Sequence, residues 1–560
     1  MKFPEMPYTR PEFEEAKTKL EDILQRFNEA DSADKCFEVY KEYDEYDRYL
    51  DSMFTIAEIR YFLDTTSEFY EGEQKYIDEV SPQLEELQQN FSTALLASPY
   101  RKELETKWGT LMFDNIEMSL KTFSPEIVPD LQEENKLESE YDKLIASAQI
   151  DFDGKTLTLA QISPYYENPD QAVRKAAVEA SSAWFLERID TFDDIFDKLV
   201  KVRTGIANKL GHDKYTQVGY YRMKRNCYDK EMVSKFREGV VKYIVPVVER
   251  LKAEQAKRIG VDTIKIYDNA FEYPDGNPKP QGTPEDIFAH GKKMYHELSD
   301  ETAEFINFML ENELFDVLTR KGKVAGGYCS SIPMYKAPFI FANFNGTSGD
   351  IDVLTHEAGH AYASYVAQDI YPTILQRYSM ETAEIHSMSM EFFTWPWMEG
   401  FFGEQTAKYY HSHLANALIF IPYGCMVDEF QHHIYEKPEL SSKQRNDLWL
   451  ELEAKYRPWL DLKDAPPFHA EGRRWISQLH IYVAPFYYID YCLAQIMALS
   501  FWAENQKDHK AAWEKYKRLV GFAGTKTFVE LISDAGLPSP FEPDNLKIVS
   551  DAAMEWLDNV

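Results

Sequence analysis

The stretch Thr355-His356-Glu357-Ala358-Gly359-His360-Ala361-Tyr362 (THEAGHAY) contains the pattern His-Glu-x-x-His. Residues four apart on an α-helix lie one turn apart on the same face, so the imidazoles of His356 and His360 can point at one divalent cation. Glu357 then stands beside an open coordination position, where its carboxylate can handle the protons of a bound water. The alternative is a helix with two hydrogen-bonded core histidines.

A zinc site needs a third protein ligand, and the following helical segment, SMETAEIHSMSMEFFTWPW, offers candidates. We expect Glu384 to be that ligand, because the chain between it and His356 is long enough for a helix, a turn and a returning helix. Glu391 lies two turns further on the same face and either bonds a ligand imidazole or forms a buried salt bridge. Glu381 is a weaker ligand candidate, and His386 either packs or contacts substrate.

The segments THEAGHAYASY and ETAEIHSMSMEFFTW closely resemble the oligoendopeptidase F branch of the thimet oligopeptidase family of zinc metallopeptidases. The resemblance covers roughly residues 200–560. It implies that His356, His360 and Glu384 bind one Zn²⁺ and that Glu357 is the general base. It also implies a mainly α-helical, two-lobed fold with a deep channel, which admits only short unstructured peptides.

A cluster of tyrosines lies in the segment QLHIYVAPFYYIDYCLAQ. Hydrolysis of a peptide passes through an oxyanion, which a tyrosine hydroxyl or a histidine N–H can stabilise together with the metal. Tyr488 and Tyr491 are three apart and share a helical face. Each hydroxyl also has a purely structural explanation as a hydrogen-bonded core tyrosine. The candidates are His480, Tyr482, Tyr487, Tyr488 and Tyr491.

This segment is similar to the His…Tyr-x-x-Tyr element of the thimet and angiotensin-converting enzyme families. The similarity implies that Tyr491 and His480 stabilise the oxyanion, while Tyr488 holds the peptide backbone or its carboxylate. Tyr487 is a further candidate for substrate binding. The thimet branch has a glycine-rich loop where this sequence has Val483-Ala484-Pro485. The loop is therefore expected to be stiffer, and which tyrosine contacts the oxyanion stays open.

The run PFIFANFNG, Pro338–Gly346, is β-prone and directly precedes the zinc-binding helix. We expect a small antiparallel sheet here. An exposed edge of this strand could pair with an extended peptide, with Ala342 and Asn343 as contacts. The alternative is an ordinary structural strand.

The composition limits the possible partners and compartments. The chain has 560 residues, 44% of them apolar, and a formal net charge of −33, which disfavours binding to nucleic acid or an anionic membrane. We see no apolar signal segment, and the longest apolar run is too short to span a bilayer. The five cysteines are widely separated, which suits a reducing cytoplasm. They are Cys36, Cys227, Cys329, Cys425 and Cys492.

Helical periodicity dominates the chain, and we divide it into an N-terminal helical region, 1–200, and a catalytic domain, 201–560. Asp153-Gly154 predicts a hairpin turn. The basic residues Arg222, Lys224 and Arg225 are expected to pair with nearby acids. In the segment HAEGRRW, one of the two arginines could bind a peptide carboxylate, although helix-face salt bridges are the commoner explanation.

The sequence thus predicts a zinc endopeptidase that hydrolyses internal bonds of short peptides. Two alternatives stay open. A carboxypeptidase or dipeptidyl carboxypeptidase could use the same zinc site, and a non-catalytic, peptide-binding helical protein could use a metal structurally or not at all. The oligomeric state and the residue preference around the cleaved bond are not predicted.

Overall fold

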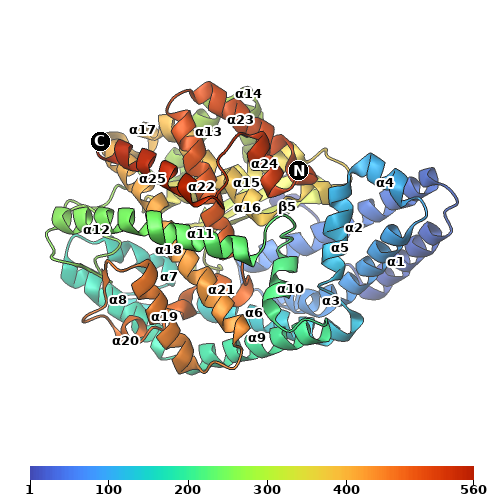
Figure 1. Cartoon of the computed structure of the whole chain (residues 1–560), viewed down its shortest axis with the longest axis horizontal. Coiled ribbons are helices and arrows are strands. Elements are labelled where there is room, and N and C mark those ends of the chain that lie inside the picture. Colours follow the sequence, from blue (N-terminus) through green and yellow to red (C-terminus); the bar gives the residue numbers. More distant parts are fainter. Residues whose placement is uncertain (560) are drawn as a thin grey trace.

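The computed structural model describes residues 1–559, and α-helices make up most of them. Sheets are small, with two or three strands each. In Figure 1, helices α1 (Phe13–Asn28) and α4 (Arg101–Trp108) lie at the right-hand end of the molecule, while α15 (Gly349–Ala367) and α16 (Met380–Phe393) lie near its centre. The predicted fold class, mainly α with small sheets near the site, is confirmed.

The N-terminal helices bury one apolar stripe each. Helix α1 buries Ala16, Leu20, Ile23 and Phe27, which recur every three or four residues. The hydroxyl of Ser32 accepts a hydrogen bond from a backbone N–H of the next helix and so caps its first turn. The further helices of this part are α2 (Ala33–Leu63), α3 (Glu68–Ala97), α5 (Thr110–Leu120) and α6 (Val128–Ala146).

The predicted hairpin is present as β1 (Ile150–Phe152) and β2 (Lys155–Leu157), which pair antiparallel. Asp153 and Gly154 both have positive φ, 51° and 69°, as a tight two-residue turn requires. Helices follow: α7 (Leu159–Ile162), α8 (Gln171–Leu186), α9 (Ile189–Lys209), α10 (Tyr215–Arg222), α11 (Lys230–Tyr243) and α12 (Val245–Ile259). The short strand β3 (Ile264–Lys265) pairs in parallel with β7 (Leu460–Asp461).

The sheet beside the site contains β4 (Phe315–Leu318), β5 (Tyr328–Ile332) and β6 (Ala337–Phe344) in the order β4-β6-β5. Strand β6 pairs antiparallel with β5 but parallel with β4, so the sheet is mixed and not purely antiparallel. The prediction of an exposed edge on this run was wrong, because β6 is the central strand. Its near-continuous apolar run is typical of a strand buried on both faces.

The helices that carry the site pack closely at their centre. Gly359 of α15 faces α16: a Cβ there would lie 2.6 Å from the Ser387 Cα atom and 2.7 Å from the His386 carbonyl oxygen. Only glycine permits this approach. Helix α16 packs in turn against α22 (Tyr488–Asn505), so α15, α16 and α22 form one unit.

The remaining helices surround this unit. Figure 1 shows α13 (Pro284–Leu298), α14 (Asp300–Glu311) and α23 (His509–Gly521) above it and α19 (Ser442–Tyr456) below it. The others are α17 (Glu399–Phe402), α18 (Thr406–Glu436), α20 (Pro467–Ala470), α21 (Leu479–Val483), α24 (Phe528–Asp534) and α25 (Pro543–Leu557).

One apolar core extends from Phe3 to Leu557 and includes residues on both sides of position 200. The division into regions 1–200 and 201–560 therefore stays a prediction. Within residues 1–559, none of the helices combines the length and the apolar character that crossing a membrane requires.

Candidate active site

The three predicted metal ligands lie together between α15 and α16. Nε2 of His356 is 3.2 Å, and Nε2 of His360 is 3.5 Å, from Oε2 of Glu384. One donor atom from each residue can be chosen so that all lie within 4.8 Å of one another. Two imidazole nitrogens and one carboxylate oxygen form a donor set that suits Zn²⁺. The Glu384 side chain is only 1% exposed, so its charge needs a cationic partner.

Glu391 orients His356. Nδ1 of His356 lies 2.7 Å from Oε1 of Glu391, and Nε2 of His413 lies 2.8 Å from Oε2. Trp395 Nε1 donates to Nδ1 of His413 at 3.0 Å, so His413 donates to Glu391 through Nε2. A carboxylate only accepts, so His356 carries a hydrogen on Nδ1 and turns its Nε2 toward Glu384. Glu391 thus bonds the imidazole of His356 and pairs with His413, while the role of His356 as a metal ligand stays a prediction.

Glu357 lies beside the predicted ligands, and its Oε2 atom has no hydrogen-bond partner among the described residues. Its side chain is buried. Burial raises the pKa of the Glu357 carboxyl, because a buried charge is disfavoured. Its other oxygen faces the segment before β5, where a Cβ added to Gly327 would lie 3.5 Å from Oε1.

His480 and Tyr491 form a hydrogen-bonded pair, with Nε2 3.2 Å from the hydroxyl oxygen. Gln478 Nε2 donates to Nδ1 of His480 at 3.1 Å, so the neutral imidazole carries its hydrogen on Nε2 and donates to Tyr491. Burial lowers the pKa of His480 to about 4, which keeps it neutral at pH 7. The hydroxyl hydrogen of Tyr491 is therefore available for another acceptor.

The other three tyrosines occupy different places. The Tyr487 hydroxyl donates to Oε1 of Glu384, and its ring stacks on Tyr491 with centroids 4.9 Å apart. The Tyr488 ring lies 4.8 Å from the ring of His480. Tyr482 is fully buried and donates to the carbonyl of Phe192, which makes it a core residue. A substrate contact by Tyr487 or Tyr488 stays a prediction.

The two less favoured candidates on α16 lie away from the donor set. Glu381 is not among the three clustered donors and lies near the charges of Asp490 and Arg225. His386 is fully buried with its ring edge-on to Tyr378, 4.7 Å between centroids, and it packs in the core.

Comparisons with known proteins agree with this geometry. The chain matches the family model described as Peptidase family M3 over residues 165–547 and the Peptidase M3 N-terminal domain over residues 3–123. The chain belongs to peptidase family M3. The similarity extends further toward the N-terminus than the motifs alone indicated. Membership in this family makes the chain a peptidase, which acts on peptides.

Individual relatives from this family support the assignment. The chain is 23% identical to Oligopeptidase PepF of Bacillus subtilis (strain 168) over 549 residues, which is 92% of this chain and 79% of that protein. It is 48% identical to the solved structure of PZ peptidase A with inhibitor 2, with a TM-score of 0.98 and coverage of 100% and 99%. Oligoendopeptidase-F from Enterococcus faecium, 14% identical with a TM-score of 0.64 and 98% coverage of both chains, shares the fold.

A cavity of about 290 Å³ adjoins the candidate active site of this peptidase on the side of His480 and Tyr491. Its apolar part comes from Met388, Ala417 and Phe420, and its polar part includes Glu391, Asp352 and Tyr488. Apolar and polar groups thus both line this cavity.

Strands β4 and β5 are the two edges of the sheet, because β6 lies between them, and β5 is the edge strand whose preceding residue, Gly327, lies near Glu357. Ala342 is fully buried, and its carbonyl accepts a hydrogen bond from the Lys323 ammonium. The Asn343 amide donates to the carbonyls of Val324 and Gly326 at 2.9 and 2.8 Å. These two residues hold the sheet together, and the prediction that they contact substrate along an exposed edge was wrong.

Buried polar contacts fix the start of α22, where the tyrosines lie. The guanidinium of Arg225 donates to the Phe486 carbonyl and, at 2.8 Å, to Asp490, and both charged side chains are fully buried. The Phe486 N–H donates to the Gln431 side chain at 3.0 Å, and Phe486 itself has φ +70°. Sequence reasoning missed this support, although an Asp inside the aromatic run YYIDY signals a buried partner.

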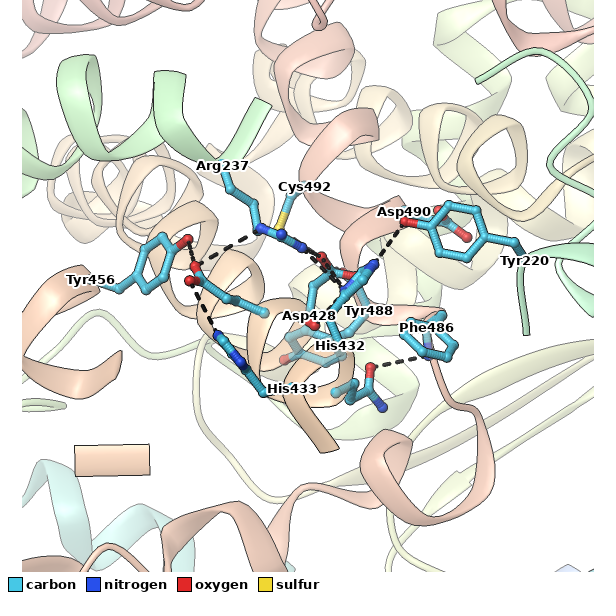
Figure 2. Close-up of polar contacts among 12 residues, drawn as sticks. Tyr220, Arg237, Asp428, His432, His433, Tyr456, Phe486, Tyr488, Asp490 and Cys492 are labelled. Carbon is cyan, nitrogen blue, oxygen red and sulfur yellow. Dashed lines mark hydrogen bonds and ion pairs between the residues drawn. The ribbon is translucent and has the colours of Figure 1, made fainter. Parts of the chain in front are cut away.

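Figure 2 shows a second set of contacts beside this turn, on α18. Tyr220 bonds His432 Nε2 at 3.0 Å, and Arg237 contacts both Asp428 and His432. The His432 ring lies 5.0 Å from that of Phe486. The turn before the tyrosines is therefore held on one side by the pair of Arg225 and Asp490 and on the other by the ring of His432.

The remaining basic candidates differ in their partners. Arg222 and Arg225 pair with acids, as predicted, whereas the ammonium of Lys224 forms no hydrogen bond or ion pair with residues 1–559. In the HAEGRRW segment, Arg473 pairs with Glu471 at 2.8 Å, and Arg474 donates to Ser477. Nearby, burial lowers the pKa of His469 to about 3.

Proposed function

We propose that this peptidase is a zinc-dependent endopeptidase that cleaves internal bonds of short, unstructured peptides. The observation that carries the proposal is the meeting of His356, His360 and Glu384 beside the unpartnered oxygen of Glu357. A buried carboxylate oxygen with no partner is costly in a structural site and useful in a catalytic one.

His356, His360 and Glu384 are the ligands we assign to the cation. When bound there, Zn²⁺ supplies Lewis acidity and lowers the pKa of a water molecule. Glu357 takes the proton of the attacking water on Oε2 and passes it to the nitrogen of the leaving amine. Burial raises the pKa of this carboxyl, which favours uptake of a proton by Glu357.

Tyr491 stabilises the oxyanion in this proposal, and His480 positions it. Support comes from the hydrogen-bond direction, since the His480 N–H occupies the Tyr491 oxygen and leaves its hydrogen for the substrate. A preorganised hydroxyl of this kind stabilises developing charge without reorganising. Tyr488, which lines the adjoining cavity, is the tyrosine we assign to substrate binding.

The substrate backbone is expected to lie along β5, whose outer edge has unpaired backbone groups. Pairing of this kind forms hydrogen bonds with the peptide backbone, so it requires an extended peptide. Strand β5 thus takes the place of β6, for which the sequence predicted the substrate edge. We also propose a cytoplasmic location, supported by five free cysteines, which differ from the disulfide framework of many secreted proteins.

The experiment combines a variant with a chelator. Internally quenched peptides with blocked ends are assayed with wild-type protein and Glu357→Gln, with and without a chelator, and products are mapped by mass spectrometry. We expect internal cleavage by the wild type, loss with chelator, and a fall of about 100-fold or more in kcat for Glu357→Gln with zinc retained. Near-normal turnover by Glu357→Gln would reject the mechanism, and intact blocked peptides would indicate an exopeptidase.

A further inference from the structure

A second cavity, of about 440 Å³, lies beside the C-terminal end of β5. Its walls come from five parts of the chain: α2, the end of α10 with the residues that follow it, β5 with the turn that follows it, the end of α15, and the segment that leads into α16. Ser331 of β5 and Ser364 of α15 are among the lining residues, and Ser364 is one helical turn beyond His360.

The lining of this cavity is positively charged. Three cationic side chains, Arg222, Lys224 and Arg377, line it together with one carboxylate, Asp51. Arg377 pairs with Asp51 at 2.7 Å. This excess of positive charge stands out in a chain whose formal net charge is −33.

Two of the cationic side chains, Arg222 and Lys224, have N–H donors without a partner in the described part of the chain. Arg222 directs Nη1 at Glu134, 2.9 Å away, while its buried Nη2 has no hydrogen-bond partner among residues 1–559. The backbone N–H of Lys224 donates to the Tyr221 carbonyl at 2.9 Å, but its ammonium forms no hydrogen bond or ion pair with residues 1–559. Burial and the nearby charge of Arg377 lower the pKa of the Lys224 ammonium to about 8, as expected for a cation without a counter-ion. Lys224 is also held at φ +53°, a conformation that costs free energy in a non-glycine residue.

Strand β5 connects this cavity with the catalytic centre. Its N-terminal end lies at Glu357, since a Cβ on Gly327 would lie 3.5 Å from the Glu357 carboxylate. Ser331, four positions further along, lines the cavity. An extended peptide paired with β5 advances ~3.3 Å per residue, so it reaches the cavity after roughly four residues.

We propose that this cavity binds a carboxylate of the peptide substrate, roughly four residues from the cleaved bond. The inference rests on the proposed function, because it takes β5 as the substrate edge. The carboxylate belongs either to an acidic side chain or to the C-terminus of the peptide. A guanidinium and an ammonium with free donors bind either one by charge-assisted hydrogen bonds.

The test uses internally quenched peptides in matched pairs. One series replaces Gln by Glu at a single position at a time, on either side of the mapped cleavage site, with both ends blocked. A second pair differs only in a free or an amidated C-terminus. We expect kcat/KM of the wild type to rise by about tenfold for Glu at one position or for the free C-terminus, the scale of one hydrogen bond to a charged group.

Variants then assign the effect to the cavity. Lys224→Met should bring the ratio between the two peptides of the pair close to one, and Lys224→Glu should reverse it in favour of a Lys-containing peptide. Lys235→Met is the matched control, because Lys235 is exposed and forms no hydrogen bond or ion pair in the described chain; it should leave the ratio unchanged.

The outcomes separate this inference from the proposed function. Cleavage of the neutral peptides by the wild type reports the endopeptidase activity alone. If those peptides are cleaved but neither Glu at any position nor a free C-terminus raises kcat/KM, the carboxylate site is wrong. It is equally wrong if a preference exists but survives in both Lys224 variants.

Discussion

The two sides of the active site are built differently. The metal side consists of α15, which carries the His-Glu-x-x-His motif, and α16, which carries Glu384. Gly359 of α15 allows α16 to approach closely. The tyrosine side, at the start of α22, depends on contacts across the chain, such as that between Arg225 and Asp490, which are 265 residues apart. Local spacing along a helix therefore determines which residues can form the donor set, whereas the position of the tyrosine hydroxyls depends on tertiary structure.

The largest effect should come from the tyrosine side. Tyr491→Phe removes the hydroxyl that we assign to the oxyanion, so kcat should fall by about 100- to 1,000-fold. Because Tyr491 is not among the donors, zinc content should stay unchanged. Kinetics and metal analysis of the same preparation check this. Tyr482→Phe is the control, since that hydroxyl bonds a core carbonyl. Equal losses in the two variants would contradict the assignment.

On the metal side, zinc affinity should depend on the carboxylate of Glu391. Glu391→Gln weakens the orientation of His356, so zinc affinity should fall by about 10- to 100-fold. Activity at saturating zinc should recover in large part. Titration with a zinc buffer measures both quantities. An unchanged affinity would mean that Glu391 serves the fold and not the metal.

The sequence could predict one side better than the other, for physical reasons. His356, His360 and Glu384 were found because helical periodicity determines which residues share a face. The edge expected at Ala342 was wrong, because a single strand does not reveal which neighbours it pairs with. The role of Arg225 could not be predicted either, since its partner depends on how α22 packs against the segment after α10.

Arg225 tests whether the support on the tyrosine side is needed. Arg225→Met leaves Asp490 buried without a partner, which should cost about 3 to 5 kcal/mol in the free energy of unfolding. Activity should fall through kcat, while zinc affinity stays near that of the wild type. Arg225→Lys should restore part of both losses. If the double variant with Asp490→Asn is as unstable as the single one, the pair is not the cause.

The smallest effect is expected from the contact between the metal helices. Gly359→Ala forces a methyl group against the backbone of α16 and should cost about 1 to 3 kcal/mol in unfolding free energy. Gly72→Ala is the matched control: it also lies within a helix, and its added Cβ meets no atom within 4 Å. Chemical denaturation measures both. Equal stabilities of the two variants would argue against the close approach.

The central claim is that His356, His360 and Glu384 hold one zinc ion. Metal analysis and zinc titration of wild-type protein and Glu384→Ala test it most directly, with Glu381→Ala as the control for a neighbouring buried carboxylate on the same helix. We predict one zinc per chain in the wild type and in Glu381→Ala, and a severe loss of zinc affinity in Glu384→Ala. Full zinc content and unchanged affinity in Glu384→Ala would contradict the account.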